Sequence, residues 1–171
     1  MAKLLAKHGE PPVILFSEEV FKINRRGEAV PRVMLVATHA IYMLNSETHR
    51  MHRKLPLRSL GALRMSELSD NFLAIINPGE YDCLVVCVRK IEAVVATCEA
   101  HSAAVAALGM GEASAGGGSG GGELGAELPV ELSNRFTYKA GAKVTKLVTF
   151  RRLDNGDVDT TISDAHSSTV S

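Results

Sequence analysis

Basic side chains cluster around one short polar turn near the start of the sequence. Lys22 ends a stretch that is typical of a strand, Arg25 and Arg26 lie in the turn NRRGE, and Arg32 comes early in the next apolar stretch. Because the two arms of a hairpin lie side by side, Lys22 and Arg32 would both stand beside the loop. An arginine can bind two phosphate oxygens at once, whereas a lysine acts as a point charge. The spacing therefore predicts a site for a group that carries several phosphates, and the alternative is a solvated basic turn.

Three further residues are candidates for the same site. Tyr42, on the following strand, offers either a hydroxyl ligand or a packing side chain. Arg53 and Lys54 form either a second wall of the site or an exposed face that protects a sheet edge. The predicted binding residues are therefore Lys22, Arg25, Arg26, Arg32, Tyr42, Arg53 and Lys54.

The sequence gives only weak evidence for a catalytic or metal-binding set of residues. The three cysteines have neither zinc-site nor disulfide-framework spacing and are expected to be reduced, buried thiols: Cys83, Cys87 and Cys98. Ser69-Asp70 with the distant His101 lacks a nucleophile elbow. An Asp-rich turn resembles a calcium loop only superficially, since the required Glu and flanking helices are missing: Asp154, Asp157 and Asp159. We expect no enzyme activity, no catalytic residue, no cofactor and no metal site.

The elements that must position the basic residues are mostly strands. Seven short runs with β-type patterning and short connections precede any helix-like segment: 13–23, 30–37, 40–44, 50–55, 60–66, 72–77 and 82–89. An Ala-rich stretch without Gly or Pro then predicts a helix over 90–108, with Ile91, Val94, Val95, Cys98, Val105 and Leu108 at helical spacing. Three more strand-like runs follow a glycine-rich segment: 128–138, 146–152 and 157–162.

This order predicts a mainly β fold with one helix. Seven strands closed by one amphipathic C-terminal helix is the order of a pleckstrin-homology-like barrel or sandwich, whose first hairpin lies at an open, basic end; extra C-terminal strands would follow. The expected organisation is an N-terminal extension 1–12, a core 13–108, a flexible Gly-rich linker 109–126, C-terminal strands 127–162 and a disordered tail 163–171.

Charge is polarised along a chain whose formal net charge is zero. Between Lys22 and Arg64 nine basic residues face only two acidic ones, so this segment carries +7 and the other 128 residues carry −7. Three histidines in the segment add charge below about pH 6.5: His39, His49 and His52. Such polarity favours an anionic partner. The first residues contain neither a secretory signal core nor a membrane span, so we expect a cytoplasmic protein that contacts membranes peripherally.

Four stretches resemble the tail-homology-1 domain of class I myosins. They are LFSEEVFKINRRGEAVPRVMLVATHAIYML, HRMHRKLPLRSLGALRMSELSDNFLAII, YDCLVVCVRKIEAVVA and LPVELSNRFTYKAG, in the family's order across roughly residues 13–152. The resemblance implies a pleckstrin-homology-like fold that binds anionic phospholipids such as phosphoinositides and phosphatidylserine. The resemblance also implies that Lys22 and Arg32 are the pair of residues critical for lipid binding. The sequence departs from the family pattern at Val30, where a basic residue is usual, and it contains no nucleotide-binding phosphate loop.

The expected function is therefore a peripheral membrane-binding module at the inner face of membranes, associated with the cytoskeleton. Its expected partners are anionic phospholipids and a myosin motor or an actin-cytoskeleton protein, not nucleic acid. One alternative is a protein-interaction adaptor of the same fold that acts without lipid. A second alternative is nucleic-acid binding by the basic segment, although interleaved aromatic residues are too few for base stacking.

Overall fold

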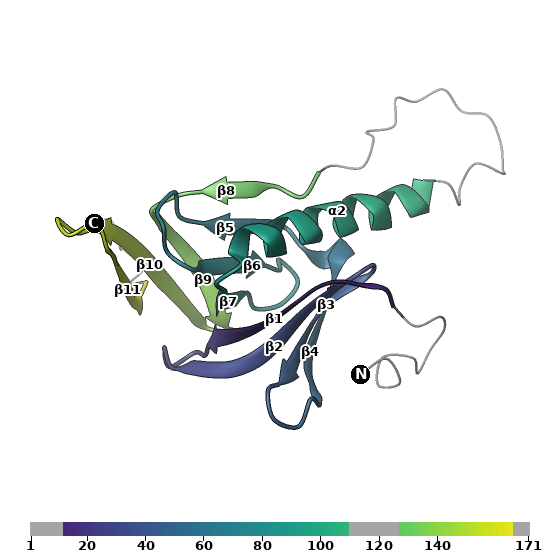
Figure 1. Ribbon diagram of the computed structural model, residues 1–171, viewed down its shortest axis with the longest axis horizontal. Coiled ribbons are helices and arrows are strands. Elements are labelled where there is room, and N and C mark those ends of the chain that lie inside the picture. Colours follow the sequence, from purple (N-terminus) through teal and green to yellow (C-terminus); the bar gives the residue numbers. More distant parts are fainter. Residues whose placement is uncertain (1–11, 110–126, 166–171) are drawn as a thin grey trace. The chain divides into compact units, whose positions relative to one another are not determined.

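The computed structural model describes residues 12–109 and 127–165, which divide into two compact units (Figure 1). The first unit takes the residues up to Glu19 together with Arg32–Leu60 and Ile91–Leu128. The second takes Val20–Pro31, Gly61–Lys90 and the residues from 129 onward. The division of the chain into a core 13–108 and C-terminal strands 127–162 remains a prediction. The expected extension 1–12, linker 109–126 and tail 163–171 lie mostly outside the described residues. The described positions among them are 12, 109 and 163–165.

The order of the elements confirms a mainly β protein with a single helix in the described ranges. Seven strands come first: β1 Ile14–Ile23, β2 Ala29–Ala37, β3 Ala40–Asn45, β4 Met51–Pro56, β5 Ala62–Met65, β6 Phe72–Ile76 and β7 Cys83–Val86. A short 3-10 turn, η1 (Leu57–Ser59), separates β4 from β5, and helix α2 (Lys90–Gly109) follows β7. The expected extra strands are β8 Val130–Leu132, β9 Arg135–Gly141, β10 Val144–Arg152 and β11 Val158–Asp164.

Strands β2, β3 and β4 of the first unit form an antiparallel meander. Leu35 pairs with Tyr42, and Tyr42 pairs with Lys54. One face of the meander carries a buried cluster of Val33, Leu35, Ala37, Ala40, Tyr42 and Leu44. The alternating residues project to the other face, where Met34, Val36, Ile41, Met43 and Leu55 are also buried. Burial of both faces explains why β3 reads as a continuous apolar run rather than as an alternating one.

Helix α2 buries a different set of residues from the one its apolar spacing predicts. Its buried face consists of small or polar side chains and one valine: Ala93, Val94, Thr97, Ala100 and His101. Ile91, Val95 and Leu108 are instead about half exposed. The buried face of the helix therefore carries mainly small and polar side chains rather than the large apolar ones. The helix is long and apolar enough to cross a membrane by length and composition, a test that core helices of soluble proteins also pass.

The second unit contains two sheets. Strands β1, β7, β6, β5 and β8 are neighbours in that order, with β8 parallel to β5, and β9, β10 and β11 form a separate antiparallel sheet. Phe136, Tyr138, Val148 and Phe150 from the smaller sheet share one core with Ile23, Ala74 and Leu84. The strands that follow the glycine-rich segment therefore extend the larger sheet by β8 only.

Two buried carboxylates fix the second unit. Asp70 accepts a hydrogen bond from the backbone N–H of Phe72 (2.8 Å) and forms an ion pair with Lys90 (3.2 Å). Asp82 accepts from the N–H groups of Asn77 (2.8 Å) and Lys139 (2.7 Å), which ties the β6–β7 turn to β9. The LSDNF stretch that carries part of the family resemblance thus has a structural role at the start of β6.

Candidate functional site

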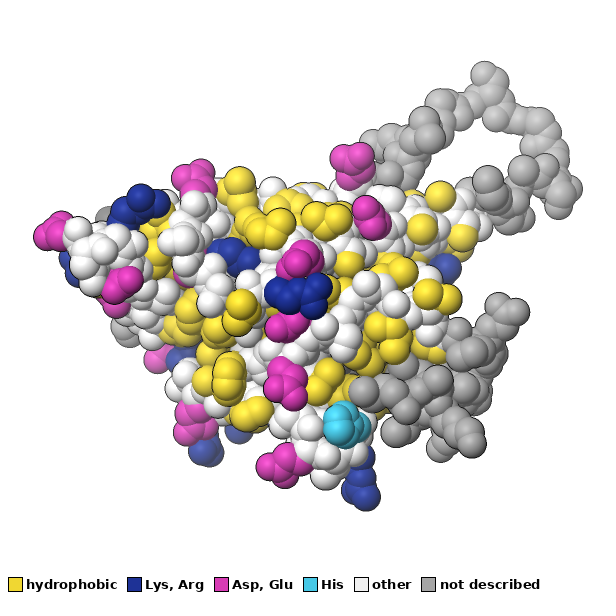
Figure 2. All heavy atoms as spheres, viewed as in Figure 1, with side chains coloured by type: hydrophobic (Ala, Val, Ile, Leu, Met, Phe, Trp, Pro, Cys, Tyr) yellow, Lys and Arg dark blue, Asp and Glu magenta, His cyan; other side chains and the backbone are white. Residues whose placement is uncertain are grey.

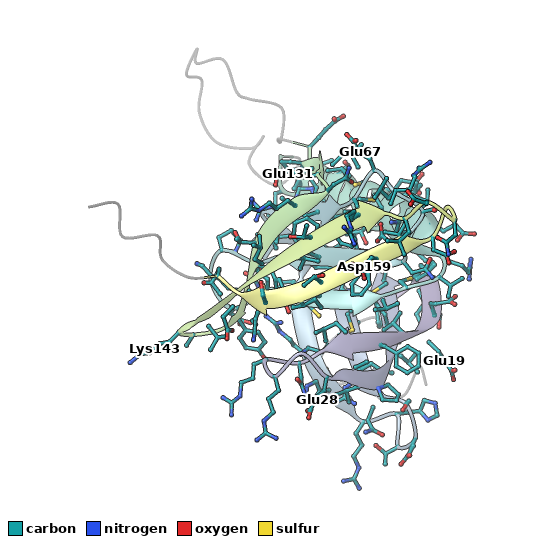
Figure 3. The ribbon with its side chains drawn as sticks, turned by 90° about the vertical axis from the view of Figure 1, so that its left-hand side faces the viewer. Glu19, Glu28, Glu67, Glu131, Lys143 and Asp159 are labelled. Carbon is teal, nitrogen blue, oxygen red and sulfur yellow. The ribbon has the colours of Figure 1, made fainter. Side chains whose placement is uncertain are left out.

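The turn between β1 and β2 is held by side-chain hydrogen bonds that leave its arginines out. Asn24 Oδ1 accepts from the backbone N–H groups of Arg26 (2.8 Å) and Glu28 (3.0 Å), and Asn24 Nδ2 donates to Glu28 Oε2 (2.8 Å). Gly27 has φ of +89°, a conformation that other residues rarely adopt. Figure 3 shows Glu28 at this turn. The sequence NRRGE therefore builds a fixed turn with its own amide, carboxylate and glycine.

The cations of this hairpin differ in exposure. Arg25 and Arg26 are exposed, and within the described ranges neither guanidinium has a hydrogen-bond or ion-pair partner. Lys22 is half-buried and pairs with Val85 on β7. Its neighbour Ile23 belongs to the apolar core of the second unit, so Lys22 projects to the opposite face. The turn thus offers two free guanidinium groups in the second unit, with Lys22 close to them in sequence.

The other predicted residues belong to the first unit and lie on two faces of its sheet. Arg32 pairs with Asn45, and Arg53 pairs with Met43, so both arginines are on the face of Met34 and Met43. Lys54 pairs with Tyr42 on the opposite face. Arg53 is 7% exposed, whereas Lys54 is exposed. Strand alternation therefore puts Arg53 and Lys54 on opposite faces, whereas the sequence predicts for both residues either a shared second wall of the site or an exposed face.

Tyr42 is held between two basic groups. His39 Nε2 lies 2.6 Å from the Tyr42 hydroxyl oxygen, and the two rings meet edge to face at 5.8 Å between centroids. Lys54 Nζ lies 5.8 Å from the centre of the Tyr42 ring, a cation–π arrangement. Tyr42 itself is only 3% exposed, while His39 and Lys54 are exposed. Tyr42 is thus a packing residue whose hydroxyl already has a partner.

The environment of this cluster changes the pKa of two groups. Partial burial lowers the pKa of His39 below its usual 6.5, and the nearby Lys54 ammonium lowers it further. Burial raises the pKa of Tyr42 above 10. The sequence predicts only that His39 adds charge at low pH. Its position three residues before Tyr42, across a tight turn, is the sequence feature that could have indicated its contact with Tyr42.

Two basic residues elsewhere in the second unit, Arg64 and Lys146, are already paired. Arg64 Nε forms an ion pair with Glu131, and its Nη1 donates to the carbonyl of Thr137 (3.0 Å). Lys146 pairs with Asp164 (2.6 Å). A cavity of about 740 Å³ between these strands is lined by two basic and two acidic side chains, Arg64, Arg135, Glu131 and Asp164. Its charges balance, so it does not favour an anion as the turn at Arg25 does.

Similar proteins include heavy chains of class I myosins. The chain is 24% identical over 153 residues to myosin heavy chain IB of Acanthamoeba castellanii, an alignment that covers 86% of this chain and 12% of that protein. It is 29% identical over 92 residues to the myosin ID heavy chain of Dictyostelium discoideum, covering 46% of this chain and 8% of that protein. The chain thus spans about an eighth or less of the length of these relatives.

Two solved structures are more distantly similar. A truncated linker-DH/PH fragment of p115-RhoGEF gives a TM-score of 0.45 at 12% identity, over 58% of this chain and 36% of that one. The hSac2 domain of the human phosphoinositide phosphatase Sac2 gives a TM-score of 0.47 at 9% identity, over 77% of this chain and 83% of that one.

The family comparison covers the whole sequence. The family is described as the unconventional myosin tail, actin- and lipid-binding, and its model matches residues 1–171. The chain belongs to this family of myosin tail-homology domains.

Proposed function

We propose that this chain binds anionic phospholipids peripherally at the cytoplasmic face of membranes. The basic hairpin residues Lys22, Arg25 and Arg26 of the second unit would contact the headgroups, and Arg32 would make a headgroup contact of its own on the first unit. The observation that carries the proposal is the state of Arg25 and Arg26: both are exposed and without a partner in the described ranges, on a turn that other groups hold in place. Phosphoinositides and phosphatidylserine offer the phosphate and carboxylate oxygens that such guanidinium groups bind.

The expected affinity follows from the number of engaged cations. A basic residue near an anionic leaflet contributes on the order of 1 kcal/mol, so about five of them give roughly 5 kcal/mol. That corresponds to a Kd of roughly 0.1–1 mM in accessible lipid. Long residence then requires either a fitted headgroup site or several copies on one surface.

The place of the chain in a larger protein follows from its relatives. It matches a small part of two myosin heavy chains, so we propose that it serves as the membrane tether of a motor or of an actin-associated partner. In this role it has no catalytic task of its own, and it needs neither cofactor nor metal. The family is described as binding actin as well as lipid, which supports a role at the junction of membrane and cytoskeleton.

Co-sedimentation with vesicles tests lipid binding. Removing two headgroup contacts costs about 2 kcal/mol, so Arg25→Ala with Arg26→Ala should weaken binding to phosphatidylserine vesicles about 30-fold. Lys22→Ala with Arg32→Ala should abolish pelleting. The charge-matched control is Arg151→Ala with Arg152→Ala, which removes two exposed cations from β10. Circular dichroism of each variant checks that it folds.

Three outcomes would contradict the proposal. The wild-type chain could bind neutral phosphatidylcholine vesicles as tightly as anionic ones. The β10 control could lose as much binding as the hairpin variant, which would indicate attraction by net charge alone. Finally, the chain could shift RNA in a gel while failing to bind any vesicle, which would favour a nucleic-acid partner.

A second candidate function is protein interaction through α2. Ile91 and Val95 are one helical turn apart and 55% and 49% exposed. Figure 2 shows hydrophobic side chains along this helix. An exposed apolar helix face is a common contact surface for another protein. Partner capture that survives the loss of the hairpin cations would favour this function.

A further inference from the structure

The cluster of His39, Tyr42 and Lys54 differs from the ion-paired cations described above. Arg64, Lys90 and Lys146 are each neutralised by a carboxylate. Within the described ranges the hydrogen-bond, ring and cation–π contacts of His39, Tyr42 and Lys54 are with one another, and no carboxylate is among them. One buried tyrosine therefore holds two exposed basic groups close together, and no carboxylate neutralises them.

The surroundings of His39 contain few other charges. On β4, Lys54 is the neighbour of Tyr42, and the exposed His52 lies where the β3–β4 register shifts. The β2 residues on this face are apolar. Val13, the residue before β1, contacts the turn through its carbonyl, which accepts from the Thr38 N–H (3.1 Å).

The remaining contacts of the turn involve η1. Its Leu57 N–H donates to the carbonyl of His39 (3.1 Å), and the charged residue of η1 is the exposed Arg58. The carboxylates Glu18 and Glu19 belong to the later part of β1, away from the contact at Val13. The local charge that acts on His39 is thus the ammonium of Lys54.

We propose that His39 and Lys54, positioned by Tyr42, form a phosphate-binding site of the first unit that gains a proton when it binds. This inference rests on the proposed lipid-binding function and adds its pH regulation. The ligand chemistry is a phosphate oxygen, from a lipid headgroup or from free phosphate. Lys54 donates to it permanently, and protonated His39 donates from Nδ1, the ring nitrogen that does not contact Tyr42, and adds a full positive charge.

The coupling between proton and ligand follows from linkage. Without ligand, protonation of His39 is opposed by its partial burial and, to a smaller extent, by Lys54, so the site is mostly singly charged near neutral pH. A phosphate placed between the two groups offsets this repulsion and raises the pKa of His39. Affinity must then increase as pH falls through the histidine range, about tenfold for each unit by which the bound and free pKa values differ.

Vesicle binding at two pH values tests the site in the full chain. We would use phosphatidylcholine vesicles with and without phosphatidylserine, whose phosphodiester keeps its charge between about pH 5.5 and pH 7.5. The wild-type Kd should decrease about tenfold at the lower pH. His39→Gln, which retains an amide that can bond to Tyr42, should remove most of this decrease. Lys54→Met should weaken binding at both pH values.

His49→Asn is the matched control. His49 is an exposed histidine of the same unit, and its φ of 54° suits asparagine. This variant should keep the wild-type pH dependence. If His39→Gln keeps it too, or if His49→Asn loses it, the proposed site is wrong.

A second measurement separates this site from the proposed function. The pKa of His39 can be followed by NMR of its ring proton, with and without inorganic phosphate, in the same chain. If no vesicle binds at any pH, the proposed lipid function fails; a rise of the His39 pKa in phosphate would then still support the site, with free phosphate as its ligand. An unchanged pKa in phosphate together with pH-independent vesicle binding would overturn it.

Discussion

At the scale of single residues, the basic side chains of this protein fall into two kinds according to their partners. Some stabilise the fold, as Lys90 does by neutralising the buried carboxylate of Asp70. Others, such as Arg25 and Arg26, are exposed and have no partner within the described ranges. Only cations of the second kind are available to a ligand without first losing an internal interaction.

Lys90 allows a test of the cations that stabilise the fold. Lys90→Met leaves the Asp70 carboxylate, 4% exposed, without its cation, so the free energy of unfolding should fall by about 3–5 kcal/mol. Lys146→Met is the control, because its partner Asp164 is 68% exposed and such a pair contributes about 1 kcal/mol or less. Urea unfolding followed by circular dichroism measures both. Equal losses in the two variants would show that Asp70 does not depend on Lys90.

At the scale of elements, strand alternation decides which predicted residues can act together. Arg53 and Lys54 are consecutive, and for that reason their side chains project to opposite faces of β4. The same rule brings Lys54 next to Tyr42 and so to His39, which are distant from it in sequence. The helix also departs from what residue spacing predicts, since its buried face carries mainly small and polar side chains.

The two faces of α2 predict different responses to polar substitution. Ile91→Gln with Val95→Gln should change the free energy of unfolding by less than about 0.5 kcal/mol, because both side chains are half exposed and Gln favours helices. Val94→Gln should cost about 2 kcal/mol or more, because Val94 is 8% exposed. Thermal and urea unfolding give these values. A large loss in the double variant would mean that Ile91 and Val95 are covered in solution.

At the scale of the whole molecule, charge distribution matters more than net charge. The chain is formally neutral, yet the segment from Lys22 to Arg64 carries +7. The structure reduces the free part of this charge, since Arg64 is paired with Glu131 and Arg53 is buried. The exposed remainder can attract an anionic surface over a distance set by ionic strength.

Salt should therefore weaken membrane binding. Between about 50 and 300 mM NaCl the Debye length falls from roughly 14 to 6 Å, and the Kd for phosphatidylserine vesicles should rise about tenfold or more. Co-sedimentation over a salt series measures this change, with sucrose at equal osmolarity as the control for vesicle shape. A Kd that does not respond to salt would indicate that apolar insertion, not charge, holds the protein on the membrane.

The sequence by itself determined the order of strands and helix, the NRRGE turn and the family, because periodicity, turn residues and motifs are local properties of the chain. It also indicated Lys22, Arg25, Arg26 and Arg32 as candidates, which stay predictions until lipid binding is measured. Only the tertiary structure decided which cations are paired and which share a face. Arg64 meets a glutamate 67 positions away, and Tyr42 gathers His39 and Lys54 across strands. Such contacts depend on strand register and long-range packing, which residue spacing alone does not encode.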